Sequence, residues 1–144
     1  MSQDWKKIFE RLEQLLPPPP PPTDWRASVA FRWRNSGRRN APGWLQPVRH
    51  VHRIRLADLR GIDKQIARVE QNTRQFLEGR PANNVLLTGA RGTGKSSIVK
   101  GLLAKYSGKG LRLIEIEKSD LIDLPAITEG SPDGASASCS FATT

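Results

Sequence analysis

The residues with the clearest potential for chemistry lie between Gly89 and Ser96, where the sequence reads GARGTGKS. The spacing G-x-x-x-x-G-K-[ST] is typical of loops that hold nucleotide phosphates, and its fixed positions are filled by Gly89, Gly94, Lys95 and Ser96. Such a loop needs glycines because its backbone N–H groups must face inward around the β-phosphate, which leaves no room for Cβ atoms. The sequence therefore predicts a loop that binds a polyphosphate.

Individual residues of this loop have distinct expected roles. Lys95 is predicted to reach the β- and γ-phosphates and to be the catalytic residue, and the Ser96 hydroxyl is predicted to ligate Mg²⁺. A helix that starts near Lys95 would point its positive end at the phosphates. The predicted nucleotide-binding residues are Gly89, Ala90, Arg91, Gly92, Thr93, Gly94, Lys95, Ser96 and Ser97.

The segments around the loop follow the order of an α/β fold. Residues 63–78 have apolar side chains at helical spacing, and residues 83–89 form a short apolar segment that predicts a strand. Residues 95–106 return to helical spacing, residues 111–117 predict a second strand, and residues 121–127 predict the start of another helix. This order is the one in which a parallel α/β sheet begins.

The N-terminal part differs in composition from the rest. Residues 2–16 carry one apolar stripe at helical spacing, and residues 17–22 are six prolines that predict a stiff spacer. Residues 24–60 then contain nine arginines and only two acidic residues. The aromatic residues interleaved with these arginines are Trp25, Phe31, Trp33 and Trp44.

This Arg/Trp-rich arm permits two interpretations. Its aromatic rings can stack on nucleic-acid bases while the arginines pair with phosphates. Alternatively, the rings tuck a poorly structured arm against a core while the arginines stay in water, which we favour because the spacing fits no established nucleic-acid module. His50 and His52 lie in the same stretch and are expected to be solvated.

The segment Leu56–Ile127, which includes RGIDKQ, VLLTGARGTGKSS and LIEIEK, resembles a bacterial family of predicted AAA+ ATPases catalogued as a domain of unknown function. Arg32 and Trp33 in the arm also resemble residues of this family. The resemblance implies the start of a P-loop NTPase sheet, ATP as the nucleotide, and Ile62 near the adenine. It implies oligomerisation in the full-length family but no particular pathway.

Hydrolysis in this class also requires a Walker B strand that ends in an acid. Glu115 and Glu117 lie on the strand directly after the loop helix, whereas AAA+ proteins take the metal-holding acid from the next strand. That next strand is expected where the composition changes: residues 128–144 contain no Lys or Arg. In a shifted reading frame, the codons of residues 138–144 can encode four apolar residues, a cysteine and two aspartates. We therefore predict a frameshifted or truncated copy, with a tail that is disordered or frameshifted.

Composition narrows the remaining possibilities. The chain has 144 residues and a formal net charge of +9, so it should attract polyanions. There is no apolar run of the ~20 residues that span a bilayer and no signal peptide, which together with the single Cys139 indicates a cytoplasmic protein. The predicted organisation is an N-terminal helix at 1–16, the spacer and arm at 17–60, a partial ATP-binding domain at 61–127 and the tail at 128–144.

Three functions follow from these features. The first is ATP binding through the loop, with hydrolysis weak or absent because Walker B is missing. The second is a nucleic-acid-binding module that uses residues 25–60. The third is an adaptor in which residues 1–22 dock a protein partner.

Overall fold

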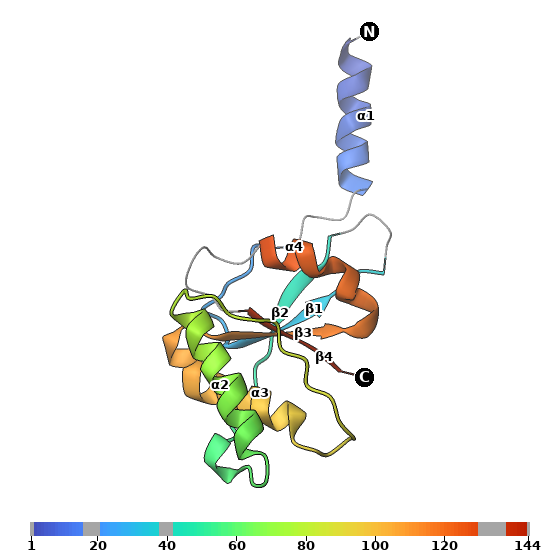
Figure 1. Ribbon diagram of the computed structural model, residues 1–144. Helices are drawn as coiled ribbons and strands as arrows, with labels where there is room; N and C mark the ends of the chain where they lie inside the picture. Colours follow the sequence, from blue (N-terminus) through green and yellow to red (C-terminus); the bar gives the residue numbers. More distant parts are fainter. Residues whose placement is uncertain (1, 16–20, 38–41, 130–137, 144) are drawn as a thin grey trace.

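The computed structural model describes residues 2–15, 21–37, 42–129 and 138–143, and these form a mixed α/β fold (Figure 1). Three short 3-10 segments, η1 (Leu56–Asp58), η2 (Ser107–Lys109) and η3 (Lys118–Asp123), connect the longer elements. The α-helices and strands are α1 (Ser2–Leu15), β1 (Ala30–Arg34), β2 (Trp44–Pro47), α2 (Asp63–Leu77), α3 (Lys95–Tyr106), β3 (Arg112–Glu117), α4 (Leu124–Glu129) and β4 (Ser138–Thr143).

The strands form one sheet in the order β2-β1-β3-β4. β3 pairs in parallel with β1 on one side and with β4 on the other, but β2 pairs antiparallel with β1. The sheet is therefore mixed, and the prediction of a parallel sheet was correct for β1, β3 and β4 but not for the edge strand β2. The reason is the short connection at 35–43, which suits an antiparallel pair, whereas parallel neighbours need a longer crossover.

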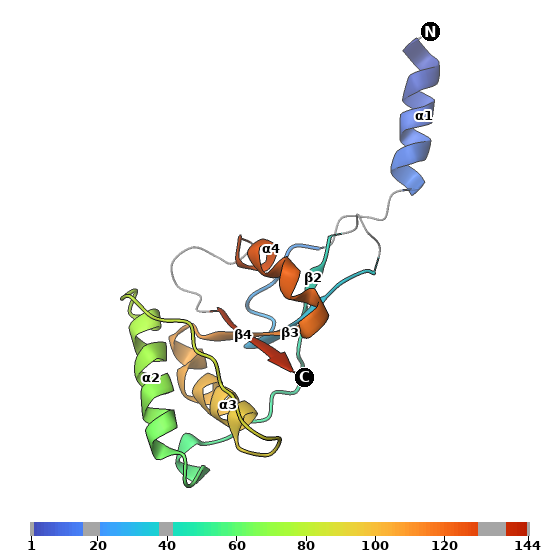
Figure 2. The ribbon, with the colours of Figure 1, turned by 45° about the vertical axis from the view of Figure 1, so that its right-hand side comes forward.

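Helices cover both faces of this sheet. α2 and α3 lie on one face and α4 on the other, as the two views of the ribbon show (Figures 1 and 2). The α3 side buries a cluster that includes Ala30 and Leu113 with residues of both helices, and the α4 side buries Trp33, Ile114, Ile116 and Ile127. Alternating side chains of β1 and β3 thus serve two separate cores.

The Arg/Trp-rich arm is more ordered than we predicted. Its residues 30–34 are a central strand, and Phe31 is fully buried there while its ring meets Trp25 edge to face at 5.1 Å between centroids. Trp33 is buried as well, and Arg32 between them points away and stays exposed. The alternation in AFRWR, apolar and charged in turn, is the period of a half-buried strand and explains why this segment enters the sheet.

The strand predicted at 83–89 does not form. Residues 81–89 have no regular secondary structure, and the side chains of Val85 and Leu86 are 48% and 86% exposed. The physical reason is a lack of a partner, because both edges of β3 are already paired with β1 and β4. The helices predicted around this segment did form, with boundaries within one residue of those expected.

The C-terminal segment, predicted as a disordered or frameshifted tail, contains regular structure in its described part. α4 continues to Glu129, and residues 138–143 form β4 alongside β3. Residues 130–137 and 144 lie outside the described part, as do the prolines at 17–20. β4 contains no Asp or Glu, which bears on the chemistry discussed below.

α1 projects away from the rest of the molecule in both views (Figures 1 and 2). The large apolar side chains of its stripe are exposed, and they are Trp5, Ile8, Phe9, Leu12 and Leu15. None of the described helices has the length and apolar character to cross a membrane.

Candidate phosphate-binding loop

The predicted loop leads directly into α3, as its motif requires. α3 begins at Lys95, and Gly94 at its N-cap has a φ of +87°. Gly92 has a φ of +86°, again in the left-handed region that disfavours residues with a Cβ atom. The two glycines therefore let the chain turn sharply and present its backbone at the positive end of the helix.

Two other glycine contacts show how closely the loop packs. A Cβ atom on Gly94 would lie 3.1 Å from Cδ1 of Ile62, and one on Gly89 would lie 3.1 Å from Oγ1 of Thr93. Ile62 thus lies beside the loop, although it comes from the residue just before α2. The fold places Ile62 against Gly94 of the motif, and its position near an adenine stays a prediction.

The ammonium group of Lys95 is folded over the loop. Its Nζ donates hydrogen bonds to the carbonyl oxygens of Gly89 and Ala90, each at 2.7 Å, and reaches Oγ1 of Thr93 at 3.3 Å. Thr93 Oγ1 in turn donates to the Ala90 carbonyl at 2.8 Å. The positive charge is therefore held at the centre of the loop.

No backbone N–H group of the loop meets an acceptor at good hydrogen-bond geometry among the described residues. From Ala90 to Ser97 these groups donate to no carbonyl and no side chain among the described residues, and the first bonded amide is that of Ile98, which donates to Gly94 at 2.9 Å. Unpaired N–H groups at a helix start, beside a lysine ammonium, are donors suited to an anion. Ser96 and Arg91 are exposed and Ser97 is half-buried, so all three are accessible.

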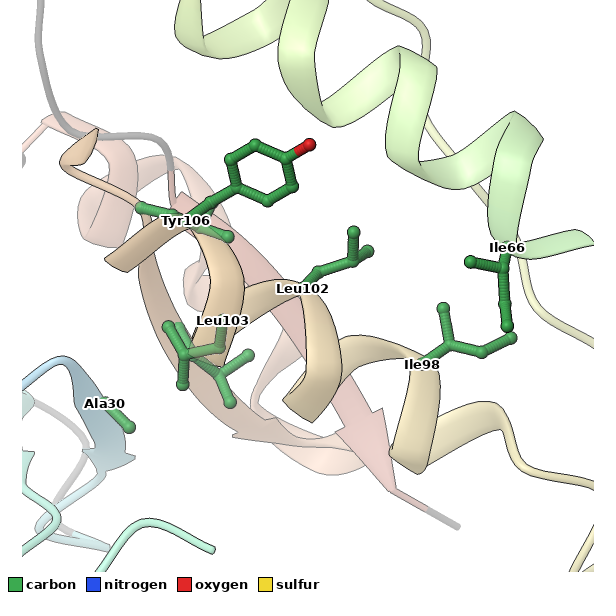
Figure 3. Packing of buried hydrophobic residues seen from close by; sticks show 8 residues of the cluster. Ala30, Ile66, Ile98, Leu102, Leu103 and Tyr106 are labelled. Atoms are coloured by element: carbon green, nitrogen blue, oxygen red, sulfur yellow. The ribbon is translucent and has the colours of Figure 1, made fainter. Parts of the chain in front are cut away.

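Packing between α2 and α3 helps to hold the loop in position. Ile66 of α2 and Ile98 of α3 are both buried and point toward one another, and Leu103 of α3 faces the sheet (Figure 3). Gly101 sits against η1 so closely that a Cβ atom there would lie 2.5 Å from Cδ2 of Leu56. The loop is thus positioned by helices, because the segment before it lies outside the sheet.

A side-chain clamp fixes the chain before the loop. Nδ2 of Asn72 donates to the Asn83 carbonyl at 2.7 Å, and Oδ1 of Asn72 accepts from the Asn83 N–H at 2.8 Å. The side-chain amide of Asn72 therefore pairs with both the N–H and the C=O of Asn83, as the backbone of a neighbouring strand would. The sequence analysis did not predict this role of Asn72. The only signal in the sequence is an asparagine on the helix that precedes the Asn83-Asn84 pair.

A polar network at the far end of α3 ties the same two helices together. The hydroxyl of Tyr106 donates to Oε1 of Glu70 at 2.7 Å, and the ammonium of Lys105 pairs with the same oxygen. These hydrogen bonds from Lys105 and Tyr106 lower the pKa of the Glu70 carboxyl. The hydrogen bond to Glu70 raises the pKa of Lys105, and burial, followed by the bond to Glu70, raises the pKa of Tyr106.

Two acidic residues near the sheet, Glu115 and Asp123, already have partners within the fold. Nη2 of Arg32 lies 2.8 Å from Oε2 of Glu115 across the β1–β3 pair, so Glu115 is neutralised within the sheet. Asp123 accepts from Nε1 of Trp33 at 3.0 Å. In the described ranges no three His, Cys, Asp or Glu side chains gather in a way that could hold a metal ion.

Burial also limits the nucleic-acid interpretation of the arm. Phe31 and Trp33 are core residues, and half-buried Trp25 packs against Phe31, so these rings are not free to stack on bases. Trp44, at 38% exposure, is the large aromatic of the arm that reaches the surface. Phe31 and Trp33 are therefore unavailable for base stacking in the folded chain, and nucleic-acid binding by other parts of the arm stays a prediction.

Comparison with known proteins places the chain in a family. A family profile described as "Protein of unknown function (DUF815)" matches residues 26–132. The chain belongs to this family. The resemblance noted from the sequence is thereby confirmed at the level of the DUF815 family, whereas its relation to AAA+ ATPases stays a prediction. No curated protein and no solved structure gave a match.

The extent of the DUF815 match agrees with the fold. It begins before β1 and so includes the arm together with the loop. The buried Phe31 and Trp33 give a structural reason for this extent, because the arm supplies strands to the same sheet that α3 covers.

Proposed function

We propose that this chain binds ATP with Mg²⁺ through residues 89–97. The observation that carries the proposal is the unpaired run of backbone N–H groups from Ala90 to Ser97, gathered around the ammonium of Lys95 at the start of α3. Such a site offers an anion both hydrogen-bond donors and the positive end of a helix dipole.

The residues present fit a nucleotide phosphate. Lys95 Nζ now bonds two carbonyl oxygens of the loop, and a phosphate oxygen would replace them as a stronger, charged acceptor. The Ser96 hydroxyl, exposed in the first turn of α3, would hold Mg²⁺, which neutralises phosphate charge when bound. Ile62 beside Gly94 would offer an apolar surface to the base.

We further propose that hydrolysis by this chain is slow or absent. P-loop ATPases require a carboxylate that holds Mg²⁺ and a residue that orients water. Glu115 is paired with Arg32, and β4, the strand next to β3, contributes no carboxylate. The loop can therefore bind the nucleotide without a complete set of groups for its cleavage.

Calorimetric titration of the full chain with ATP·Mg²⁺ tests the proposal. Lys95→Ala should weaken binding by about tenfold or more, because a charged hydrogen bond to phosphate contributes about 1.5–3 kcal/mol. Lys64→Ala removes the same charge from an exposed site on α2 and should leave affinity within about twofold. Equal affinities for the two variants would refute the assignment of the loop.

Turnover gives a separate measurement. Phosphate release by the wild-type chain should be indistinguishable from that of Lys95→Ala at saturating ATP. A turnover number of ordinary ATPase size, about 1 s⁻¹ or more, that Lys95→Ala abolishes would contradict the proposed deficiency.

A further inference from the structure

We propose that a second anion site, independent of the ATP proposal, lies between residues 48–53 and the second half of α3, and that it takes a phosphate-bearing ligand. A pocket of about 410 Å³ opens there, within the range that small ligands occupy. Its walls come from residues 27–29, from residues 48–53, from α3 between Lys100 and Ala104, and from Ser107 of η2.

The charge of this pocket is one-sided. The basic groups that line it are Arg49, Arg53 and Lys100 with the imidazoles of His50 and His52, and no Asp or Glu lines it. Arg32, Arg80 and Lys105 each pair with an acid, whereas no described residue forms an ion pair or hydrogen bond with the side chains of Arg49, Arg53 or Lys100.

The backbone of the 48–53 segment is held in place before any ligand binds. Its first residue is Val48, whose N–H donates to the Ala30 carbonyl at 2.9 Å. The carbonyl of Val48 accepts a hydrogen bond from Oγ of Ser28 at 2.7 Å. Val48 and Val51 also pack against the α3-side core cluster. Anchored valines on either side of Arg49 and His50 fix the wall of the pocket, which reduces the ordering cost of binding.

The C-terminal end of α3 does not oppose an anion here. Helix C-termini carry a partial negative charge, but Nη1 of Arg112 donates to the carbonyl of Ser107 at 3.0 Å and compensates it. The pocket is also separate from the first site, because its α3 wall begins at Lys100, more than one helical turn and about 7.5 Å along the axis from Lys95.

Phosphate is the favoured chemistry because guanidinium groups bind its oxygens in pairs and remain charged at all physiological pH values. The phosphate can belong to a free polyphosphate or to the backbone of a nucleic-acid strand, and both would be held through the same oxygens. The net charge of +9 would steer either one toward the protein.

The two histidines provide a direct readout, since the chain contains no others. The tag-free full chain carrying Lys95→Ala, which removes the contribution of the loop, would be titrated with sodium tripolyphosphate and, separately, with a short single-stranded DNA. The imidazole C–H resonances of His50 and His52 should shift saturably with at least one probe. Saturation by tripolyphosphate assigns the site to free polyphosphates, and saturation by DNA alone assigns it to nucleic-acid backbone.

Matched variants separate the pocket from general electrostatics. Arg49→Gln with Arg53→Gln should weaken binding by about tenfold or more, while Lys6→Gln with Lys7→Gln on α1 removes the same charge and should change it by less than about twofold. Lys100→Gln, on a different wall, gives a second variant if the double arginine change impairs folding. No saturable histidine shift with either probe, or equal losses in the pocket and α1 variants, would overturn the proposal.

Discussion

Strand β1 and the segment that precedes the phosphate loop show how differently two short apolar stretches can behave in one chain. β1 pairs on both sides and buries Phe31 completely, although its sequence contains two arginines. Residues 85–87, Val-Leu-Leu, are more apolar yet remain unpaired, with Leu86 largely exposed. The difference is the presence of a neighbouring strand rather than the composition of the segment.

This difference determines what supports the loop. In a sheet-supported loop, the strand before it would fix one end and the helix after it the other. Here the strand side is replaced by the Asn72–Asn83 clamp and by packing between α2 and α3. The sheet and the loop are therefore two regions with separate supports, joined through the α3-side core.

The largest expected effect comes from the sheet region. Phe31→Ala removes a fully buried ring and should lower the free energy of unfolding by about 3–5 kcal/mol. Leu86→Ala, which truncates an exposed side chain of the unpaired segment, should change it by less than about 0.5 kcal/mol. Urea unfolding followed by circular dichroism measures both. If Leu86→Ala lowered the free energy of unfolding by more than about 2 kcal/mol, the segment would have to be paired, and the contrast with β1 would be wrong.

An intermediate effect is expected where α3 meets η1. Gly101→Ala places a methyl group 2.5 Å from Leu56, an overlap that should cost about 1–3 kcal/mol, partly offset by the better helix propensity of alanine. Gly108→Ala meets nothing within 4 Å and serves as the control. Thermal unfolding should show a lower midpoint for Gly101→Ala alone. A stabilised Gly101→Ala would mean that α3 is not packed against η1.

The smallest effect concerns the tie between α2 and α3. Because the pKa of Glu70 is lowered in the folded chain, its contribution is present above the ordinary carboxyl value of 4.5 and is lost as the pH falls through the lowered value. Glu70→Gln should therefore cost at most about 1 kcal/mol at pH 7 and less at pH 3. Denaturant unfolding at the two pH values measures this, and an equal cost at both would exclude the ionised form as the source.

The sequence predicted the parts of the fold that depend on local periodicity. α2, α3 and β3 follow from apolar spacing, and the loop follows from the glycines and Lys95. The pairing of β1 with β3 could not be predicted, since it joins residues 30–32 to residues 113–115 and depends on which strands compete for the same edge. The Asn72–Asn83 clamp was missed for a similar reason, because it forms only when the strand is absent.

The central claim is that backbone amides from Ala90 to Ser97 hold a polyphosphate, and amide chemical shifts test it most directly. Titration of the ¹⁵N-labelled chain with ATP·Mg²⁺ should move the amide signals of these residues saturably, and Lys95→Ala should raise the concentration needed by about tenfold or more with the fold intact. Saturable binding that leaves these amides unmoved, or a chain that does not bind ATP·Mg²⁺, would contradict the account.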